Sequence, residues 1–550
     1  MVCTLGFRPE VVHTRRMTIN CRLVLRLLGV SVLCRALLAP VSAQPNPPPP
    51  DLWKLARDRA QTHRFSTLFC AQDVRDYLSD ENGLRNALEW CRQTGVTKVY
   101  IEVFRDGYRA ERKALENAKK RFLDEGFAVS GCVTTTRVGK PSTAWKEVGS
   151  CFTDPATQTN LQAVFEYAAS LFDEIMIDDF WFEECACPEC DRARQARTVT
   201  IGRRSFPVGG DSWEDYRCEL MTQLSRQRLL APAKRVNPNA RLIIKYPQWY
   251  ENFQDRGYEV ARETADFDRI WVGTETRDYN DRRWGGTVPY EACFIMRWLG
   301  GIGGPKCGGG WFDSLGTTES TYLEQARQTV LGGAGESMLF SYGSLQRGPG
   351  PKDILALRAN VPDLLAVARQ VGRRAIIGLA AYKPPNSHPQ DEQRVFDFLG
   401  MMGLPLVPCH EFPSNAPAAF FSVHALKDTG LPGKLGAFIK TGKPVLLTDG
   451  LARSLANQNE IRLDAPNVRV LPLKHDPKSL LQLGQRELDE LRAPLLRPLN
   501  VTFRAPNRVA LYLFNDGSWV IEDFADDNVS VELNGKPVAV AARGWACEWK

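Results

Sequence analysis

Residues 174–184 form the stretch EIMIDDFWFEE, in which a short apolar run ends abruptly in two acids, Asp178 and Asp179. Aromatic residues follow the two acids at once. A short run that is apolar throughout is typical of a strand buried on both faces, as in a parallel sheet covered by helices. Acids that follow such a strand lie at the carboxyl edge of the sheet, where α/β barrel enzymes place their chemistry. The stretch therefore predicts both a fold class and a candidate site.

Similar β-rich runs recur on both sides of this stretch, and longer segments with helical spacing of apolar residues separate them. Such alternation is the pattern of repeated βα units. Eight strands over about 280 residues match the size of a (β/α)₈ TIM barrel. An open doubly wound sheet is the alternative, but it usually carries a glycine-rich phosphate turn after its first strand, and this chain does not. The predicted strands are 66–71, 98–104, 128–134, 174–179, 241–246, 269–274, 306–312 and 336–342.

The composition of the chain changes twice after the predicted barrel, which we place at residues 64–372. Residues 373–494 alternate β-rich and helical runs again, beginning with a single predicted strand at 375–382, which predicts a smaller Rossmann-like α/β domain. Residues 495–550 are purely β in pattern, with turn signals at 515–517 and 534–535 that are typical of antiparallel hairpins. The sequence therefore predicts three folded domains, of which the last is a small C-terminal antiparallel β-domain.

The N-terminal segment has the features of an export signal. Residues 1–43 contain an apolar stretch followed by the small residues Val41, Ser42 and Ala43, which fit a signal-peptidase site. A signal anchor that stays in the membrane is the alternative. Residues 44–63 are a proline-rich linker and lead-in to the first strand. We therefore expect a secreted or periplasmic protein.

The charge of the chain lies mainly in this segment, because residues 1–43 hold six arginines and one acid while the whole chain carries a net charge of +6. The mature protein is close to neutral and shows no basic array, so we expect no nucleic-acid partner. After residue 43, no apolar run approaches the roughly 20 residues that span a bilayer. We therefore expect no membrane association after signal cleavage.

Acids at the strand ends predict carboxylate chemistry. Glu275 follows the sixth predicted strand, and hydrolysis of a glycosidic bond requires a pair of carboxyl groups flanking that bond. We predict Asp178, Asp179 and Glu275 as catalytic residues, with one of the aspartates as nucleophile or base and Glu275 as proton donor. A helix cap or an ion pair with Arg277 is the structural alternative. No histidine lies between residues 68 and 387, which excludes histidine-based metal and serine–histidine sites from the barrel.

Polar and aromatic residues at other strand ends suit a hydroxyl-rich ligand, because rings can stack on the face of a sugar. Each of them could instead serve only the packing of the barrel, and two of the acids are also rivals for the proton donor. The predicted substrate-binding residues are Glu102, Trp181, Lys245, Tyr246, Trp249, Trp311 and Asp313.

A cysteine cluster follows the acidic stretch directly. Cys185, Cys187 and Cys190 place three thiols within six residues, which favours either a metal site or a disulfide in an oxidising compartment. A tetrahedral zinc site needs a fourth ligand, and Cys151, on the loop after the third predicted strand, would lie next to the cluster in a barrel. We predict a structural zinc site. A disulfide with a leftover thiol and four free thiols remain alternatives, and we expect no organic cofactor.

The order of barrel, α/β domain and β-domain resembles the architecture of the family 42 β-galactosidases. That resemblance implies an amidotransferase-like middle domain that mediates trimerisation, so we expect a homo-oligomer. The family also carries a zinc cluster with the spacing of Cys185, Cys187 and Cys190, and an upstream cysteine as fourth ligand. Asp178 and Asp179 depart from the family, which has Asn-Glu at that strand end. The Asp-Asp-aromatic ending instead resembles the α-galactosidase and α-fucosidase groups, so galactosidase activity is not implied.

These observations together predict an exported glycoside hydrolase that cleaves O-glycosidic bonds of oligo- or polysaccharides. A non-catalytic glycan-binding protein on a degenerate barrel is the alternative, and a lyase or transferase that uses the same carboxylates is a third hypothesis. The distance between the carboxyl groups discriminates the first two, because groups more than about 10 Å apart could not act on one glycosidic bond.

Overall fold

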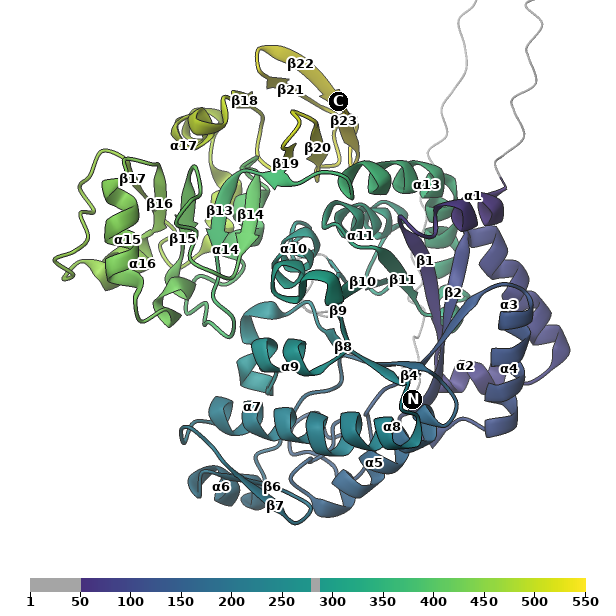
Figure 1. Cartoon of the computed structure of the whole chain (residues 1–550). Coiled ribbons are helices and arrows are strands. Elements are labelled where there is room, and N and C mark those ends of the chain that lie inside the picture. The colour runs from purple at the N-terminus through teal and green to yellow at the C-terminus, as the bar shows by residue number, and fades with distance from the viewer. Residues whose placement is uncertain (1–50, 278–286) are drawn as a thin grey trace, which may run out of the picture. The chain divides into compact units, whose positions relative to one another are not determined.

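The computed structural model describes residues 51–277 and 287–550. The predicted signal peptide and residues 44–50 of the predicted linker lie outside the described residues. Eight parallel strands form a closed ring, because β1 pairs with both β2 and β11 (Figure 1). The eight strands are β1 (Arg64–Phe69), β2 (Val96–Arg105), β4 (Ala128–Val133), β5 (Glu174–Ile177), β8 (Arg241–Tyr246), β9 (Arg269–Gly273), β10 (Cys307–Asp313) and β11 (Glu336–Phe340). The predicted TIM barrel is confirmed.

Helices follow the strands and bury their apolar faces against the ring. In α3 the Asp80 carboxylate caps the first turn by accepting from the Gly83 amide, and Gly95 ends the helix at φ 71°. The barrel helices are α1 (Leu52–Arg59), α2 (Ala71–Tyr77), α3 (Glu81–Thr94), α4 (Arg112–Asp124), α5 (Pro155–Ala169), α7 (Trp213–Leu224), α8 (Ala231–Val236), α9 (Val260–Asp266), α10 (Glu291–Gly303), α11 (Glu319–Leu331) and α13 (Gly350–Val371). A six-residue π-helix, Ser225–Leu230, joins α7 to α8.

The inside of the ring is filled by side chains. A buried apolar cluster takes one residue from each of the eight strands, so the barrel has a packed core rather than a channel. These residues are Leu68, Tyr100, Cys132, Met176, Ile243, Trp271, Trp311 and Met338. Chemistry at this fold is therefore confined to the ends of the strands.

The α/β region after the barrel is built on a five-stranded parallel sheet in the order β14-β13-β15-β16-β17. Its helices include α14 (Val395–Gly400), α15 (Leu431–Lys440) and α16 (Asp449–Leu455). Its strands are β13 (Leu379–Tyr382), β14 (Leu406–Cys409), β15 (Ala419–Phe421), β16 (Val445–Thr448) and β17 (Val468–Leu471). The sequence pattern does not predict β17, because two of its four residues are exposed and no apolar run marks it.

The C-terminal region consists of antiparallel sheets, as predicted. One sheet has the order β12-β19-β20-β23 and the other the order β18-β21-β22. Their strands are β12 (Ile376–Ile377), β18 (Phe503–Arg504), β19 (Val509–Phe514), β20 (Trp519–Asp523), β21 (Val529–Leu533), β22 (Lys536–Val540) and β23 (Trp545–Glu548).

The single strand expected at residues 375–382 is divided between two sheets. Residues 376–377 pair antiparallel with β19, whereas residues 379–382 form β13 of the parallel sheet. Gly378 lies between them, and a Cβ at this position would approach the Pro405 carbonyl oxygen to 1.9 Å. A glycine lets the backbone pass this point, so the expectation of one continuous strand was wrong.

A segment between β5 and α7 extends the mouth of the barrel. It holds α6 (Pro188–Gln195) and a hairpin of β6 (Thr198–Ile201) and β7 (Arg204–Pro207), which the sequence pattern did not predict. Among residues 51–277 and 287–550, no helix is both long enough and apolar enough to cross a membrane.

Candidate active site

Three neighbouring strand ends bring the predicted catalytic acids around one ammonium group. The Lys245 Nζ at the end of β8 lies 2.6 Å from Asp179 Oδ2 and 2.7 Å from Glu275 Oε1. It also lies 3.9 Å from Asp178 Oδ1. Since one ammonium contacts both Asp179 and Glu275, at 2.6 and 2.7 Å, the two contacting carboxylate oxygens lie no more than roughly 5 Å apart, close enough to act on one glycosidic bond.

Asp178 is the most completely hydrogen-bonded of the three acids, and it is buried. Its Oδ2 accepts from Arg105 at 2.7 Å and lies 2.9 Å from the Thr134 hydroxyl, and its Oδ1 accepts from the Asp179 amide at 2.7 Å. Burial alone would raise its pKa, but the charges of Arg105 and Lys245 outweigh burial and hold the pKa below its usual range. Asp178 therefore stays ionised, with both oxygens occupied by donors.

Asp179 and Glu275 differ from Asp178 in their electrostatic environment. Burial and the neighbouring carboxylates raise the pKa of Asp179 to about 7, although Lys245 opposes the shift. Burial also raises the pKa of Glu275, against the charges of Lys245 and Arg277. The Asp179 side chain remains 20% exposed and Glu275 only 3%. Near neutral pH the pair can hold a proton on one carboxyl group and a charge on the other, which acid–base catalysis requires.

Aromatic rings form the floor beneath the ammonium group. The Lys245 Nζ lies 4.2 Å from the ring centroid of Trp311, which is stacked on Phe340 at 5.1 Å. Phe340 is half-buried and ends the eighth strand, and the sequence pattern did not single it out. Asp313 is buried and forms an ion pair with Arg277. Asp313 thus lies beside the acids, whereas Trp311 is 2% exposed and belongs to the packed core of the barrel, so its ring cannot stack on a sugar in this arrangement.

Glu102 holds its neighbours in place instead of facing a ligand. Its Oε2 accepts from the Ala71 amide and from Arg105 Nε, both at 2.8 Å. Its Oε1 lies 2.5 Å from the Thr134 hydroxyl, which also contacts Asp178. The side chain is fully buried, and burial raises its pKa despite Arg105. Glu102 therefore orients the Arg105 guanidinium that keeps Asp178 ionised.

Two of the predicted substrate-binding rings lie in the core, away from the mouth. The indole of Trp181 is fully buried, donates to the Ser225 hydroxyl at 3.1 Å and packs edge-on against Phe152. Tyr246 is also fully buried, and its hydroxyl lies 3.1 Å from that of Thr264. Neither ring can stack on a sugar in this arrangement, so the structure does not support these two expectations.

Trp249 lies at the mouth, as predicted. Its ring is half-buried and lies under the guanidinium of Arg256, whose Cζ is 4.1 Å from the ring centroid. Tyr258 contacts the Trp249 ring at 5.6 Å and donates its hydroxyl to the Asp179 carbonyl oxygen at 2.7 Å. Trp249 is therefore connected, through Tyr258, to the backbone of the candidate acid Asp179.

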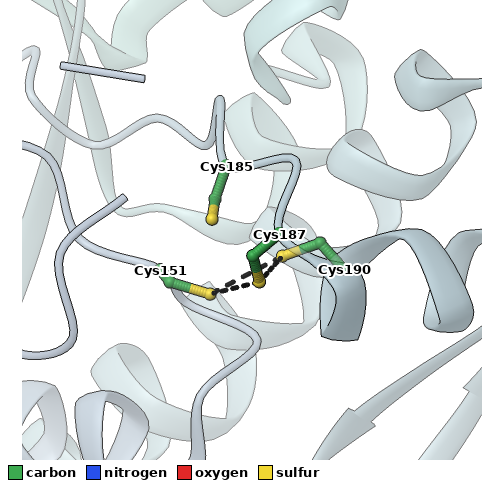
Figure 2. Close-up of side chains that lie close together, drawn as sticks. All are labelled: Cys151, Cys185, Cys187 and Cys190. Carbon is green, nitrogen blue, oxygen red and sulfur yellow. Dashed lines mark hydrogen bonds between the residues drawn. The ribbon is translucent and has the colours of Figure 1, made fainter. Parts of the chain in front are cut away.

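The four predicted cysteine ligands meet at one point (Figure 2). All four thiols are buried and free, and their sulfur atoms lie within 4.8 Å of one another. Cys151 Sγ is 3.8 Å from Cys187 Sγ and 3.6 Å from Cys190 Sγ, and Cys185 points toward the same centre. Four ligands at about 2.3 Å from a tetrahedral zinc ion would lie roughly 3.8 Å apart, whereas a disulfide requires about 2.05 Å. The donor set and spacing fit a zinc ion.

A carboxylate behind the cluster ties its two chain segments together. Glu183 is fully buried and accepts from the Phe152 amide at 2.8 Å and from the Cys185 amide at 2.5 Å. It thereby joins the loop that holds Cys151 to the segment that follows β5. A metal at this position would brace the mouth without touching the acids.

Comparison with known proteins gives a distant relative and similar folds. An uncharacterized protein of Saccharolobus solfataricus is 27% identical over 350 residues, which make up 60% of this chain and 57% of that protein. The chain thus matches a little over half the length of this relative. The α-L-fucosidase isoenzyme 2 of Paenibacillus thiaminolyticus has a similar fold, with a TM-score of 0.59 and 11% identity over 87% of this chain and 91% of that one.

A glycoside hydrolase domain of PgaB from Bordetella bronchiseptica aligns with a TM-score of 0.38 and 12% identity, over 56% of this chain and 98% of that domain. The model of the family described as "Probable glycosyl hydrolase, catalytic domain" matches residues 51–353, which include all eight barrel strands. The chain, whose residues 64–340 form a TIM barrel, therefore belongs to this family of glycosyl hydrolase catalytic domains.

Proposed function

We propose that this glycosidase hydrolyses its substrate with retention of configuration, and that Asp179 and Glu275 are its two catalytic carboxyl groups. The observation that carries the proposal is the contact of both carboxylates with the Lys245 ammonium, at 2.6 and 2.7 Å. These contacts limit the separation of the two contacting oxygens to about 5 Å, which suits a covalent glycosyl-enzyme intermediate, whereas an inverting enzyme leaves about 6.5 to 9.5 Å for a water molecule. The same separation argues against a non-catalytic glycan-binding protein.

On the charges of the site, we assign the two roles in the opposite way to the sequence-based expectation. Asp179, with its pKa of about 7 and its partly exposed side chain, donates the proton to the leaving oxygen. Glu275 attacks the anomeric carbon as a carboxylate, and the glycosidic bond breaks. Asp179 then takes a proton from water, whose oxygen attacks the same carbon and releases Glu275. Lys245 balances the charge on whichever carboxylate is ionised.

The substrate class follows from the family and from the mouth of the barrel. The half-buried ring of Trp249 contacts Tyr258, and that of Phe340 stacks on Trp311, so both lie near the acid group and suit an oligo- or polysaccharide. We further propose that residues 1–43 direct export to a secreted or periplasmic location, that the four thiols hold a structural zinc ion, and that the α/β region mediates self-association. Mass spectrometry of the exported protein and light scattering test the first and third of these proposals.

A screen of aryl glycosides and of plant, algal and host polysaccharides identifies the substrate. Proton NMR of the first product formed then reads the anomeric configuration. The proposal predicts that the product initially has the configuration of the substrate, because two displacements restore it. An initially inverted product would contradict a covalent intermediate on Glu275.

The pH profile tests the assignment of the proton. We expect kcat/KM to fall as the pH rises through about 7, because Asp179 must be protonated to act as the acid. The substitution Asp178→Asn removes a negative charge that raises the pKa of Asp179, so the basic limb of the profile should move to lower pH. Asp76→Asn, at a solvent-exposed pair with Arg75, is the control and should leave the profile unchanged. A basic limb that stays in place in Asp178→Asn would contradict the assignment.

A further inference from the structure

An exposed tryptophan lies on the loop that follows the third barrel strand, outside the set of residues that contact the acids. The side chain of Trp145 is 51% exposed, which is unusual for so large an apolar ring. Its backbone has φ 53°, in the left-handed region that residues other than glycine rarely adopt. Such a conformation persists only when the surrounding structure enforces it, and it often marks a functional position.

The loop that carries Trp145, residues 137–151, is held at several points. The Trp145 carbonyl oxygen accepts from the amides of Val148 at 2.8 Å and Gly149 at 2.7 Å. The Thr143 hydroxyl accepts from the Ala186 amide at 2.7 Å. The loop ends at Cys151, one of the four clustered thiols. The loop that carries Trp145 is therefore joined at its end to the cysteine cluster.

The ring of Trp145 belongs to a cluster of aromatic side chains around one guanidinium group. It contacts Phe182 edge-on at 6.0 Å, and Arg256 Cζ lies 5.5 Å from its centroid. Arg256 also lies 5.4 Å from the Phe182 ring and 4.1 Å from that of Trp249. Its charge is balanced by Glu184, whose Oε1 accepts from Arg256 Nε at 2.6 Å. The cluster therefore presents ring faces and a neutralised cation.

This cluster is continuous with the candidate active site. Phe180 directly follows Asp179 and contacts the Phe182 ring at 6.0 Å. Its backbone is fixed by the Thr135 hydroxyl, which donates to the Phe180 carbonyl oxygen at 2.8 Å. Phe180, the neighbour of Asp179 in the chain, is thus linked to Trp145 by two ring contacts, through Phe182.

We propose that Trp145 forms a second sugar subsite, which holds an uncharged pyranose ring of an oligosaccharide next to the ring that the acids cleave. The exposed indole offers an apolar face to the C–H face of a sugar. An anionic sugar is less suited, because Glu184 already neutralises Arg256. This inference rests on the proposed function, since it places the subsite relative to Asp179.

Binding to an inactive protein tests the subsite independently of turnover. Isothermal titration of Glu275→Gln with neutral gluco-, manno-, xylo- and galacto-oligosaccharides of one to six units identifies a ligand. We expect Trp145→Ala in this background to weaken binding of the longer oligosaccharides about tenfold and to leave monosaccharide binding unchanged. Trp145→Phe, which keeps a ring, should recover part of the affinity. Leu123→Ala replaces an equally exposed apolar residue, 48% exposed on α4, and should have no effect.

The outcomes separate this inference from the proposed function. If Glu275→Gln and the double variant with Trp145→Ala bound every oligosaccharide with equal affinity, the subsite would be overturned. The absence of any binding would overturn it as well. Binding that depends on Trp145 in a wild-type protein that hydrolyses none of these sugars would retain the subsite and refute the proposed hydrolysis. Weaker binding of monosaccharides in Trp145→Ala would place the ring in the cleavage site and likewise overturn a separate subsite.

Discussion

The substitution Glu275→Gln is expected to lower kcat on an aryl glycoside by a factor of about 10³ or more. The amide has almost the same volume as the carboxylate, but it is a poor nucleophile and cannot form the glycosyl-enzyme ester. The melting temperature should change little, because Lys245 keeps its contact with Asp179 at 2.6 Å. Steady-state kinetics together with thermal unfolding distinguish a loss of chemistry from a loss of folding.

Azide separates the two carboxyl roles. Azide should restore turnover to both Glu275→Ala and Asp179→Ala, because a small anion can enter the space that each carboxylate leaves. The Glu275→Ala product should be a glycosyl azide of inverted configuration, since azide replaces the nucleophile, and the Asp179→Ala product one of retained configuration, since azide replaces the water. Exchanged configurations would reverse the roles. Asp313→Asn is the matched control, because Asp313 is also a buried acid. If kcat fell further in Asp313→Asn than in Glu275→Gln, the catalytic carboxylate would have to be sought at the end of the seventh strand instead.

The barrel strands were predictable because burial on both faces leaves an unbroken apolar run that ends where the chain leaves the sheet. Strand β8 has the predicted bounds, and the other strands differ by a few residues at their ends. The division at Gly378 was not predictable from the run itself. Residues 376–377 and 379–382 are equally β-rich, and only the close approach of Pro405 shows where one sheet ends and the other begins.

The candidate site was predictable to the extent that strand ends fix the positions of side chains. Lys245 lies near the end of one apolar run and Glu275 follows the next one along the chain. Since their strands are neighbours in the closed ring, the two side chains meet. Trp181 lies beyond the strand end, where the chain turns and its amide donates to the Asp178 carbonyl oxygen at 3.2 Å. Alternation no longer predicts there which side chain faces the mouth. Trp145 lies in a long loop without periodicity, and its exposure appears only once the fold is known.

The substitution Cys151→Ser is expected to abolish metal binding and to loosen the mouth of the barrel. We expect one zinc ion per wild-type chain by elemental mass spectrometry and less than about one tenth of that in the variant, because a thiolate ligand set loses much of its affinity with one ligand removed. Hydrogen exchange of residues 137–151 and of α6 should become much faster, because these segments meet at the cluster. Chelation of the wild-type protein should have the same local effect.

The control for this prediction is Cys91→Ser, since Cys91 in α3 is equally buried but does not belong to the thiol cluster. It should lower the melting temperature through the cost of a buried hydroxyl and leave the zinc content at one per chain. A wild-type protein without metal and two hydrogens lighter than its thiol form would instead show a disulfide within the cluster. A zinc ion at the cluster would contact none of the proposed catalytic acids. We therefore expect kcat for aryl glycosides to fall far less in Cys151→Ser than in Glu275→Gln.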